Sequence, residues 1–361
     1  MILSVSRRTD IPAFYSEWFF GRLREGSCLV RNPFNPHQLS RIPMTPEAVE
    51  CIVFWTKNPG PMLGKLGLLD PIPFYFQFTL TGYGRDIEPG FPHKKECMIP
   101  IFRELSSQVG KDRVVWRYDP IFFTDRYTAD YHLRAFGQIA EALQGYTRRV
   151  VISFLDLYAK VKRNMKAYGG ELRTMPDSGA FGPFVSALSE IAAEHGMEIC
   201  ACAEACDLSR FGVKKSGCIS RELLERAAGR SVETRKAKGQ RGECLCVEST
   251  DIGAYHTCPG GCLYCYANDS RRRVEENRKL WDPNSALLCG AVGKNDRIGE
   301  KRAEVYGKSY LFCLHAFPYC PASAASLSQN AGMHAFCVNE ILHFRHRCGV
   351  ESQFDFILSL S

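Results

Sequence analysis

The sequence predicts an α/β protein folded as a full or partial (β/α) barrel. Apolar runs with strand character alternate along the chain with helix-like stretches, which is typical of parallel βα units. Each run ends in polar or charged residues, and in such barrels the carboxyl ends of the strands hold the active site. A length of 361 residues suits one large barrel of this kind.

Six apolar runs are the predicted strands. They cover residues 2–5, 51–55, 74–80, 113–116, 149–154 and 198–202. Helix-like stretches follow most of them, at residues 15–24, 94–109 and 130–143 and in a long region that ends at residue 195. After a predicted loop at residues 207–212, short helices are expected at residues 221–228 and 271–278.

Polar side chains stand at the ends of these strands. Because parallel strands of a barrel end at one rim, we expect the side chains to converge on one site. The alternative is that polar residues follow strands simply because loops are polar. The nine polar residues at the strand ends are Arg7, Arg8, Asp10, Lys57, Asn58, Arg117, Asp119, Asp156 and Glu204.

Composition narrows the class of protein. The chain is 45% hydrophobic and 24% charged, which excludes disorder over most of its length. No apolar run reaches the roughly 18 residues of a membrane helix, and the start, MILSVSRRTD, lacks the pattern of a signal peptide. We therefore expect a cytoplasmic protein without a membrane partner. The net charge of +7 suits an anionic partner but is also common in proteins that have none.

Cysteine usage carries the strongest signal. Seventeen cysteines are many for a compartment in which disulfides seldom persist, and nine fall between Cys200 and Cys265. Clustered thiols in such a chain indicate metal ligands. The sharpest pattern is C-x3-C-x2-C, formed by Cys258, Cys262 and Cys265, with Tyr264 just before the third cysteine.

A thiolate triad on one tight loop can hold three irons of a [4Fe–4S] cluster and leave the fourth iron open. Gly260 and Gly261 allow this loop to wrap closely around a cluster. An open iron can chelate the amino and carboxylate groups of S-adenosylmethionine (SAM), whose reductive cleavage gives a 5′-deoxyadenosyl radical that abstracts hydrogen from a substrate. The structural alternative is a zinc knuckle of two or three of these thiols with His256.

The cysteine motif with its aromatic residue resembles the signature of the radical SAM superfamily. Further segments resemble radical SAM proteins of the spore photoproduct lyase-like kind: Thr56-Lys57-Asn58, Phe78-Thr79-Leu80-Thr81, Ile87-Glu88-Pro89 with Pro92, and Arg117-Tyr118-Asp119-Pro120-Ile121. In most radical SAM proteins the cysteine loop follows the first strand, whereas here it follows six predicted strands. The resemblance therefore implies a circularly permuted barrel with the first strand and cysteine loop moved to the end.

The chain to about residue 306 also resembles an uncharacterised bacterial family that ends in this CxxxCxxC motif. The matching segments are residues 4–12, 54–59, 116–120, 153–156 and 240–268. We expect a barrel over residues 1–306, with a cysteine-rich cluster region at residues 200–270. Residues 307–361 lack clean periodicity and are expected to be an atypical tail, disordered or not native to the fold.

Four further cysteines are available for a second metal site. Cys202, Cys218, Cys244 and Cys246 suit a fully ligated [4Fe–4S] cluster or a four-thiolate zinc site. Auxiliary clusters occur in many radical SAM proteins, so the resemblance favours iron. Cys200 and Cys206 flank Cys202 and could take its place. Alternatively, some of these residues are buried thiols that act as small apolar side chains.

Six residues are predicted to contact the cofactor. Lys57 could pair with the SAM carboxylate, and the planar fork of Arg117 suits a carboxylate or phosphate. The resemblance assigns Thr79, Thr81 and Glu88 to the ribose or amine. Each could instead be a structural hydrogen-bond or ion-pair member. The six are Lys57, Thr79, Thr81, Glu88, Arg117 and Tyr264.

A second structural alternative concerns the end of the first strand. There Arg7, Arg8 and Asp10 could form a buried ion-pair network that braces the barrel mouth.

The sequence thus predicts a radical SAM iron–sulfur enzyme with an unknown substrate, for which nucleic acid is one candidate, and with a reductant such as flavodoxin or ferredoxin. The alternative is a zinc-stabilised or iron–sulfur protein that binds nucleic acid or transfers electrons without radical chemistry. Basic residues at 235–241 and 271–273 favour nucleic-acid binding, but they lack the interleaved aromatic residues that stack on bases. An electron carrier would usually ligate all four irons of its cluster.

Overall fold

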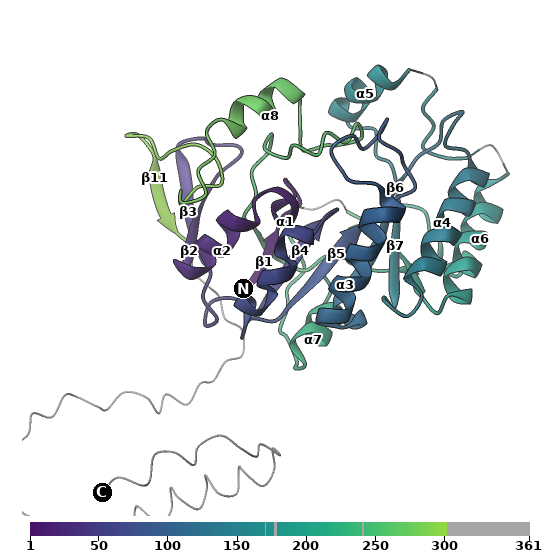
Figure 1. Ribbon diagram of the computed structural model, residues 1–361, viewed down its shortest axis with the longest axis horizontal. Coiled ribbons are helices and arrows are strands. Elements are labelled where there is room, and N and C mark those ends of the chain that lie inside the picture. The colour runs from purple at the N-terminus through teal and green to yellow at the C-terminus, as the bar shows by residue number, and fades with distance from the viewer. Residues whose placement is uncertain (170, 177–178, 240–241, 302–361) are drawn as a thin grey trace, which may run out of the picture. The chain divides into compact units, whose positions relative to one another are not determined.

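Figure 1 shows the protein as a computed structural model in which helices flank a central sheet. The structure describes residues 1–169, 171–176, 179–239 and 242–301. The chain divides into two compact units, Met1–Lys308 and Ser309–Ser361, and all described residues belong to the first. The predicted tail at residues 307–361 therefore lies outside the described residues, as do Gln240 and Arg241. Among the described helices, none is long and apolar enough to cross a membrane.

An eight-stranded sheet forms the centre of the first unit, in the order β10-β1-β4-β5-β6-β7-β8-β9. All neighbouring strands in it run parallel. No pairing joins the end strands β9 and β10 in the described part of the chain, so this sheet is open. The α/β class with a large parallel sheet is confirmed. The strands are β1 (Ile2–Val5), β4 (Cys51–Thr56), β5 (Phe74–Thr79), β6 (Val114–Ile121), β7 (Arg149–Phe154), β8 (Glu198–Ala201), β9 (Lys214–Lys215) and β10 (Thr250–Asp251).

Helices cover the sheet because successive strand side chains point to opposite faces. On β4, Ile52 and Phe54 belong to the larger apolar core, which also takes side chains from α2, α3, α4 and α6. Cys51 and Val53 join a smaller core that includes Leu223 and Leu224 of α7. The helices are α1 (Ile11–Phe14), α2 (Ser16–Arg24), α3 (Ile99–Val109), α4 (Ala129–Leu143), α5 (Ala159–Met165), α6 (Phe181–Glu194), α7 (Arg221–Ala228) and α8 (Arg271–Arg278).

Local sequence signals explain where several helices begin. The side chains of Thr128, Ser220 and Ser270 accept hydrogen bonds from the first turns of α4, α7 and α8, as N-cap residues do. Gly229 ends α7 in the left-handed conformation, which glycine adopts without steric cost. These caps fix the ends of the helices independently of the core.

A smaller sheet lies beside α2 and was not predicted (Figure 1). It has the order β11-β3-β2, from Ser27–Arg31 (β2), Gln38–Pro43 (β3) and Arg297–Glu300 (β11). Its strands contain charged and exposed positions, so they lack the continuous apolar runs of the main sheet.

All six predicted strands are present, and β6 extends five residues further than expected, to Ile121 rather than residue 116. The prediction of one long helical region up to residue 195 was wrong. Helices α5 and α6 are separate there, because Gly169, Pro176 and Gly179 interrupt the helical pattern. The predicted helix at residues 94–109 begins with a π-helical turn, Lys94–Met98, before α3. The predicted loop at residues 207–212 contains a 3-10 turn, Ser209–Phe211.

Candidate functional site

A cavity of about 500 Å³ opens at the carboxyl ends of the parallel strands. Seven of the nine strand-end residues expected to converge line its wall: Arg7, Arg8, Asp10, Lys57, Arg117, Asp119 and Asp156. The same cavity is lined by all seven predicted metal ligands: Cys202, Cys218, Cys244, Cys246, Cys258, Cys262 and Cys265. The fold therefore brings the strand ends and both cysteine sets to one place.

The other two strand-end residues make local contacts to the backbone. Asn58 Oδ1 accepts a hydrogen bond from the Gly60 N–H at 3.0 Å, at the start of the 3-10 helix Gly60–Leu69. Glu204 Oε1 accepts one from the Phe154 N–H at 2.9 Å. These two side chains hold the backbone at the ends of β4 and β7.

Asp10 connects the end of β1 to the end of β4. Its carboxylate accepts hydrogen bonds from Thr56 Oγ1 and from the Lys57 N–H, both at 2.7 Å, and it caps α1 through the Ala13 N–H at 3.0 Å. Burial raises the pKa of Asp10 to about 6, although these hydrogen bonds oppose the shift. Asp10 therefore positions the backbone at Lys57.

Asp251 ties the segment before the cysteine loop to β1. Strand β10 lies parallel to β1, with Asp251 beside Ser4. The Asp251 carboxylate accepts hydrogen bonds from Ser6 Oγ at 2.6 Å, the Arg7 N–H at 2.8 Å and the Gly253 N–H at 2.9 Å. Sequence reasoning missed Asp251 because a two-residue strand gives no periodic signal.

The cysteine loop packs closely against the segment after β5. The Gly90 N–H donates to the Gly260 carbonyl at 3.1 Å. A Cβ atom on Gly260 would lie 2.6 Å from the Phe91 ring, and Gly261 has a φ of +65°. Glycine at these positions lets the loop approach the chain without a side-chain clash.

The three thiols of this loop are half-buried and face the shared cavity. Burial raises the pKa of Cys258 to about 12 and also raises the pKa values of Cys262 and Cys265. Three thiols of one short loop that line the same cavity can supply three thiolate ligands of an iron–sulfur cluster, so the donor set fits this group.

Glu88 is the centre of a buried polar network beside the cysteine loop. Its Oε1 receives hydrogen bonds from Lys57 Nζ and Thr81 Oγ1, both at 2.8 Å, and from the Tyr264 hydroxyl. Its Oε2 pairs with Lys94 Nζ. Four of the six predicted cofactor contacts are thus joined in one network. Lys94 was not predicted, because nothing in its local sequence sets it apart from other surface lysines.

Charge in this network is compensated within the protein. Burial opposes ionisation of Glu88, but Lys57 and Lys94 outweigh it and hold the pKa of Glu88 well below its usual range. The Lys57 ammonium also lies 5.5 Å from the centre of the Tyr264 ring, within the range of a cation–π contact. Lys57, Lys94 and Glu88 therefore form one ion-pair network beside the cysteine loop.

The other two predicted cofactor contacts lie further along the sheet. Thr79 and Arg117 are neighbours on β5 and β6, and both line the cavity. Arg117 pairs with Asp119, and its Nη1 lies 2.9 Å from the sulfur of Cys218. Arg117 therefore contacts the second cysteine set rather than the Glu88 network.

Cys202, Cys218, Cys244 and Cys246 form a buried thiol group at this second place. Sγ of Cys218 lies 2.7 Å from Sγ of Cys202, and Cys246 hydrogen-bonds Cys202, Cys218 and Cys244. These hydrogen bonds raise the pKa of Cys202, and they lower the pKa values of Cys244 and Cys246 to about 6.

The two flanking cysteines make other contacts. The Cys200 thiol faces Glu198, and Cys206 is exposed. The structure thus brings together the four cysteines predicted to ligate a second metal. The thiols of Cys200 and Cys206, which could have replaced Cys202, make other contacts.

The zinc-knuckle alternative loses one of its ligands in this structure. His256 Nδ1 accepts a hydrogen bond from the Asp269 N–H at 3.0 Å, and His256 Nε2 lies 3.3 Å from the Asp269 carboxylate. Both ring nitrogens are therefore engaged away from the thiols. Among the described residues, no group of three or more His, Cys, Asp or Glu side chains is arranged, as it stands, so that it could hold a metal ion.

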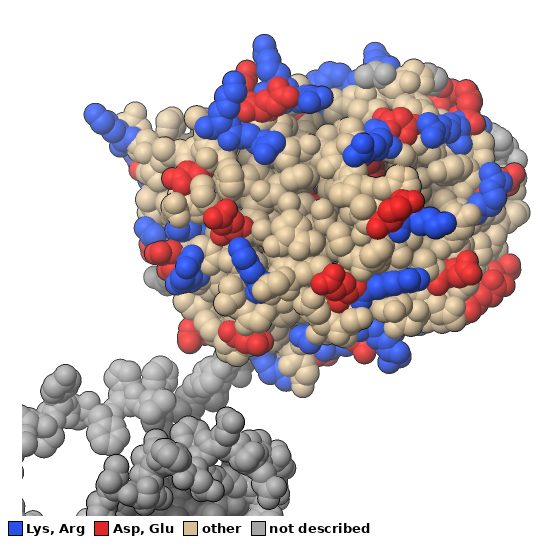
Figure 2. Space-filling model, in the orientation of Figure 1, with Lys and Arg blue, Asp and Glu red and all other residues tan. Residues whose placement is uncertain are grey.

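The charges expected to favour nucleic acid are partly neutralised. On α8, Arg271 and Arg272 pair with Glu275 and Glu276 one turn further on. Figure 2 shows blue and red side chains interspersed over the visible face rather than a continuous basic surface. Of the predicted basic stretch at residues 235–241, the last two residues lie outside the described part of the chain.

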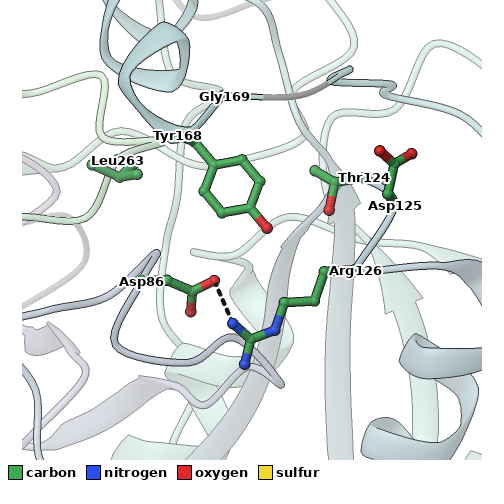
Figure 3. Close-up of a pocket in the computed structure, with 7 residues that line it drawn as sticks. All are labelled: Asp86, Thr124, Asp125, Arg126, Tyr168, Gly169 and Leu263. Carbon is green, nitrogen blue, oxygen red and sulfur yellow. Dashed lines mark hydrogen bonds and ion pairs between the residues drawn. The ribbon is translucent and has the colours of Figure 1, made fainter.

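A second cavity of about 610 Å³ lies on another side of the cysteine loop, at Leu263 (Figure 3). None of the described residues that line it is a cysteine. Its Asp86 accepts hydrogen bonds from Tyr127 at 2.7 Å and from Arg126 at 3.2 Å. Because Asp86 and Arg126 already pair with each other, this cavity is a weaker candidate than the thiol-lined one.

Residues 2–267 match a family described as "Domain of unknown function (DUF1848)". The chain belongs to this family. The matched DUF1848 region contains the whole eight-stranded sheet and ends two residues after Cys265, so it includes both cysteine sets.

No curated protein matches the DUF1848 chain. Among solved structures, one described as a "putative alpha-L-fucosidase" from Bacteroides thetaiotaomicron is 13% identical. That match covers 52% of this chain and 76% of the other, with a TM-score of 0.23, and it carries no argument about fold or function.

Proposed function

We propose that this protein is a radical SAM enzyme on a permuted βα scaffold, in which Cys258, Cys262 and Cys265 ligate a [4Fe–4S] cluster. The observation that carries the proposal is the meeting of these three thiols with the buried Glu88 network at the carboxyl ends of a parallel sheet. When bound, such a cluster with SAM supplies reductive cleavage of the sulfonium and a 5′-deoxyadenosyl radical that abstracts hydrogen.

The order of the strands supports the permuted relation to radical SAM proteins. The cysteine loop follows β10, which lies at one end of the sheet and pairs in parallel with β1. A strand that comes late in the sequence therefore occupies the position next to the first one. Moving β10 and its loop to the start of the chain would give a βα order in which the loop follows the first strand.

The residues around the loop have distinct tasks under this proposal. Lys57 and Lys94 provide positive charge for the carboxylate of an amino-acid group, and Glu88 holds both ammonium groups in place. Tyr264 donates to Glu88 and so fixes the orientation of the loop between its second and third thiols. Asp10 positions the backbone of Lys57.

The test is anaerobic reconstitution with iron and sulfide, followed by metal analysis and an assay for 5′-deoxyadenosine with SAM and dithionite. We expect about four irons per chain at this loop and formation of 5′-deoxyadenosine. The variant Cys258→Ala/Cys262→Ala/Cys265→Ala should lose both. Cys97→Ala is the matched control, because Cys97 is a half-buried thiol that is not among the residues lining the cavity.

Unchanged iron content in the triple variant would contradict the assignment of the cluster. Iron without 5′-deoxyadenosine or SAM binding would instead favour an electron-transfer protein. Zinc bound at the loop would favour the zinc-stabilised alternative.

A further inference from the structure

The second cysteine set is assembled by contacts that do not involve the Cys258 loop. Gly217 packs so closely on the segment between Cys244 and Cys246 that a Cβ atom there would lie 2.7 Å from the Leu245 carbonyl oxygen. The Val247 N–H donates to the Ile219 carbonyl at 2.9 Å. These backbone contacts hold Cys244 and Cys246 against Cys218.

The Cys218 backbone is in turn fixed to the sheet. Its carbonyl accepts hydrogen bonds from the Tyr75 hydroxyl at 2.9 Å and from Gln77 Nε2 at 2.7 Å. Both donors are buried side chains of β5. Cys202 follows β8 directly, so two of the four cysteines are anchored to the main sheet.

The spacing of these four thiols suits one ion better than a cluster. A Zn–S bond of about 2.3 Å in a tetrahedron puts thiolates about 3.8 Å apart. Cys202 and Cys218 lie at 2.7 Å and Cys246 contacts the other three, so a separation of these sulfurs by about 1 Å would admit a single ion. A [4Fe–4S] cluster interposes four irons and four sulfides between its ligands and needs much wider spacing.

Two guanidinium groups lie beside this set. Nη1 of Arg117 lies 2.9 Å from the Cys218 sulfur. Arg7 interacts electrostatically with Cys218 and Cys246, and its buried Nη2 has no hydrogen-bond partner among the described side chains. Cations next to thiols favour the thiolate form, which is the form that binds metal. Donors beside the sulfurs are also typical of the outer shell of a metal site.

We propose that Cys202, Cys218, Cys244 and Cys246 bind a single zinc ion in a closed four-thiolate site, with Arg7 and Arg117 as its outer donors. The site is independent of the cluster proposed for the Cys258 loop, because it uses different thiols and different backbone contacts. A closed tetrahedral site with four protein ligands is structural rather than catalytic. Here it would fix the segments around residues 202, 218 and 245 as one wall of the shared cavity.

The test is metal analysis of the full-length protein, with zinc as the probe. We expect one zinc per chain in the unmodified protein and in the Cys258→Ala/Cys262→Ala/Cys265→Ala variant, whatever happens to iron. Cys244→Ser/Cys246→Ser should lose this zinc. Cys200→Ser/Cys206→Ser should keep it, because the Cys200 thiol contacts Glu198 and the Cys206 thiol contacts the Asp207 carbonyl instead of the four thiols.

A second measurement covers the case in which the double variant does not fold. Cys244→His keeps a zinc-binding side chain, so it should retain one metal ion while the absorption spectrum of the cobalt-loaded protein changes with the ligand. Zinc that persists in the Cys244→Ser/Cys246→Ser variant overturns the proposal. Four irons held by these cysteines in the triple variant, or a Cys202–Cys218 disulfide in place of metal, overturn it as well.

Discussion

The two cysteine sets line the same cavity but differ in how their thiols are held. Cys258, Cys262 and Cys265 come from one short loop and lie beside a carboxylate held by two lysines. The four thiols of the second set come from three segments, contact one another, and lie beside two arginines. Three thiols on the loop can ligate a cluster that keeps an open position, whereas the four contacting thiols of the second set suit a closed site for one ion.

The largest effects on metal content are expected when a glycine that packs against either cysteine set is replaced by alanine. Gly217→Ala should abolish metal binding by the second set and leave iron at the loop, because the new Cβ would lie 2.7 Å from a backbone oxygen. Gly260→Ala should abolish iron binding at the loop and leave zinc at the second set, because its Cβ would lie 2.6 Å from the Phe91 ring. Iron and zinc contents of both variants measure this. Gly64→Ala is the control, because its Cβ would meet no atom within 4 Å.

If either glycine variant loses iron and zinc together, the two cysteine sets are not independent metal sites.

Glu88→Gln is expected to destabilise the protein by about 3–5 kcal/mol, because Lys57 and Lys94 would remain buried beside a neutral amide. Urea unfolding measures this loss. Iron at the loop should fall while zinc at the second set stays unchanged. Glu96→Gln is the control, because the Glu96 side chain is 61% exposed. A loss as small as that of the control would show that Glu88 does not hold the lysines.

Thiol reactivity in metal-free protein should separate the two sets by about a hundredfold or more near pH 7. The pKa values of Cys244 and Cys246 are lowered to about 6, so their alkylation should rise with pH up to about 6 and then level off. The pKa of Cys258 is raised to about 12, so its alkylation should still be rising at pH 9. Iodoacetamide pulses followed by peptide mass spectrometry measure both. Equal rates at neutral pH would contradict the described difference in environment.

Arg117→Lys should have the smallest effect. It keeps the positive charge but loses the planar fork that reaches both Asp119 and Cys218. We expect roughly tenfold weaker zinc binding at the second set and no change in iron. Competition with a chelator measures the zinc affinity. Weaker iron binding with unchanged zinc would place Arg117 at the cofactor loop, as the sequence-based assignment had it.

Much of the main sheet could be predicted because its strands are apolar on both faces. Residues 51–55 and 150–152, for example, are almost entirely buried, so they appear as continuous apolar runs. Strand β10 could not be recognised because it has two residues, and β2 and β3 mix buried with exposed positions. The convergence of strand ends followed from the parallel arrangement alone.

The contacts within the site were predictable only in part. The motif spacing grouped Cys258 with its two neighbours, but spacing alone could not show that Cys202 and Cys218 lie near Cys244 and Cys246. That grouping depends on the pairing of β8 in the sheet and on the close packing at Gly217. Arg117 was predicted to contact the cofactor, whereas in the structure its Nη1 lies beside Cys218, on the face of β6 that also carries Val115 into the smaller core.

The most direct test is electron paramagnetic resonance of the anaerobic, dithionite-reduced protein before and after addition of SAM. If Cys258, Cys262 and Cys265 leave one iron open, SAM should change the signal of a reduced [4Fe–4S] cluster, and the triple alanine variant should show no such signal. A cluster signal that SAM leaves unaltered, or that persists without these three thiols, would contradict the account.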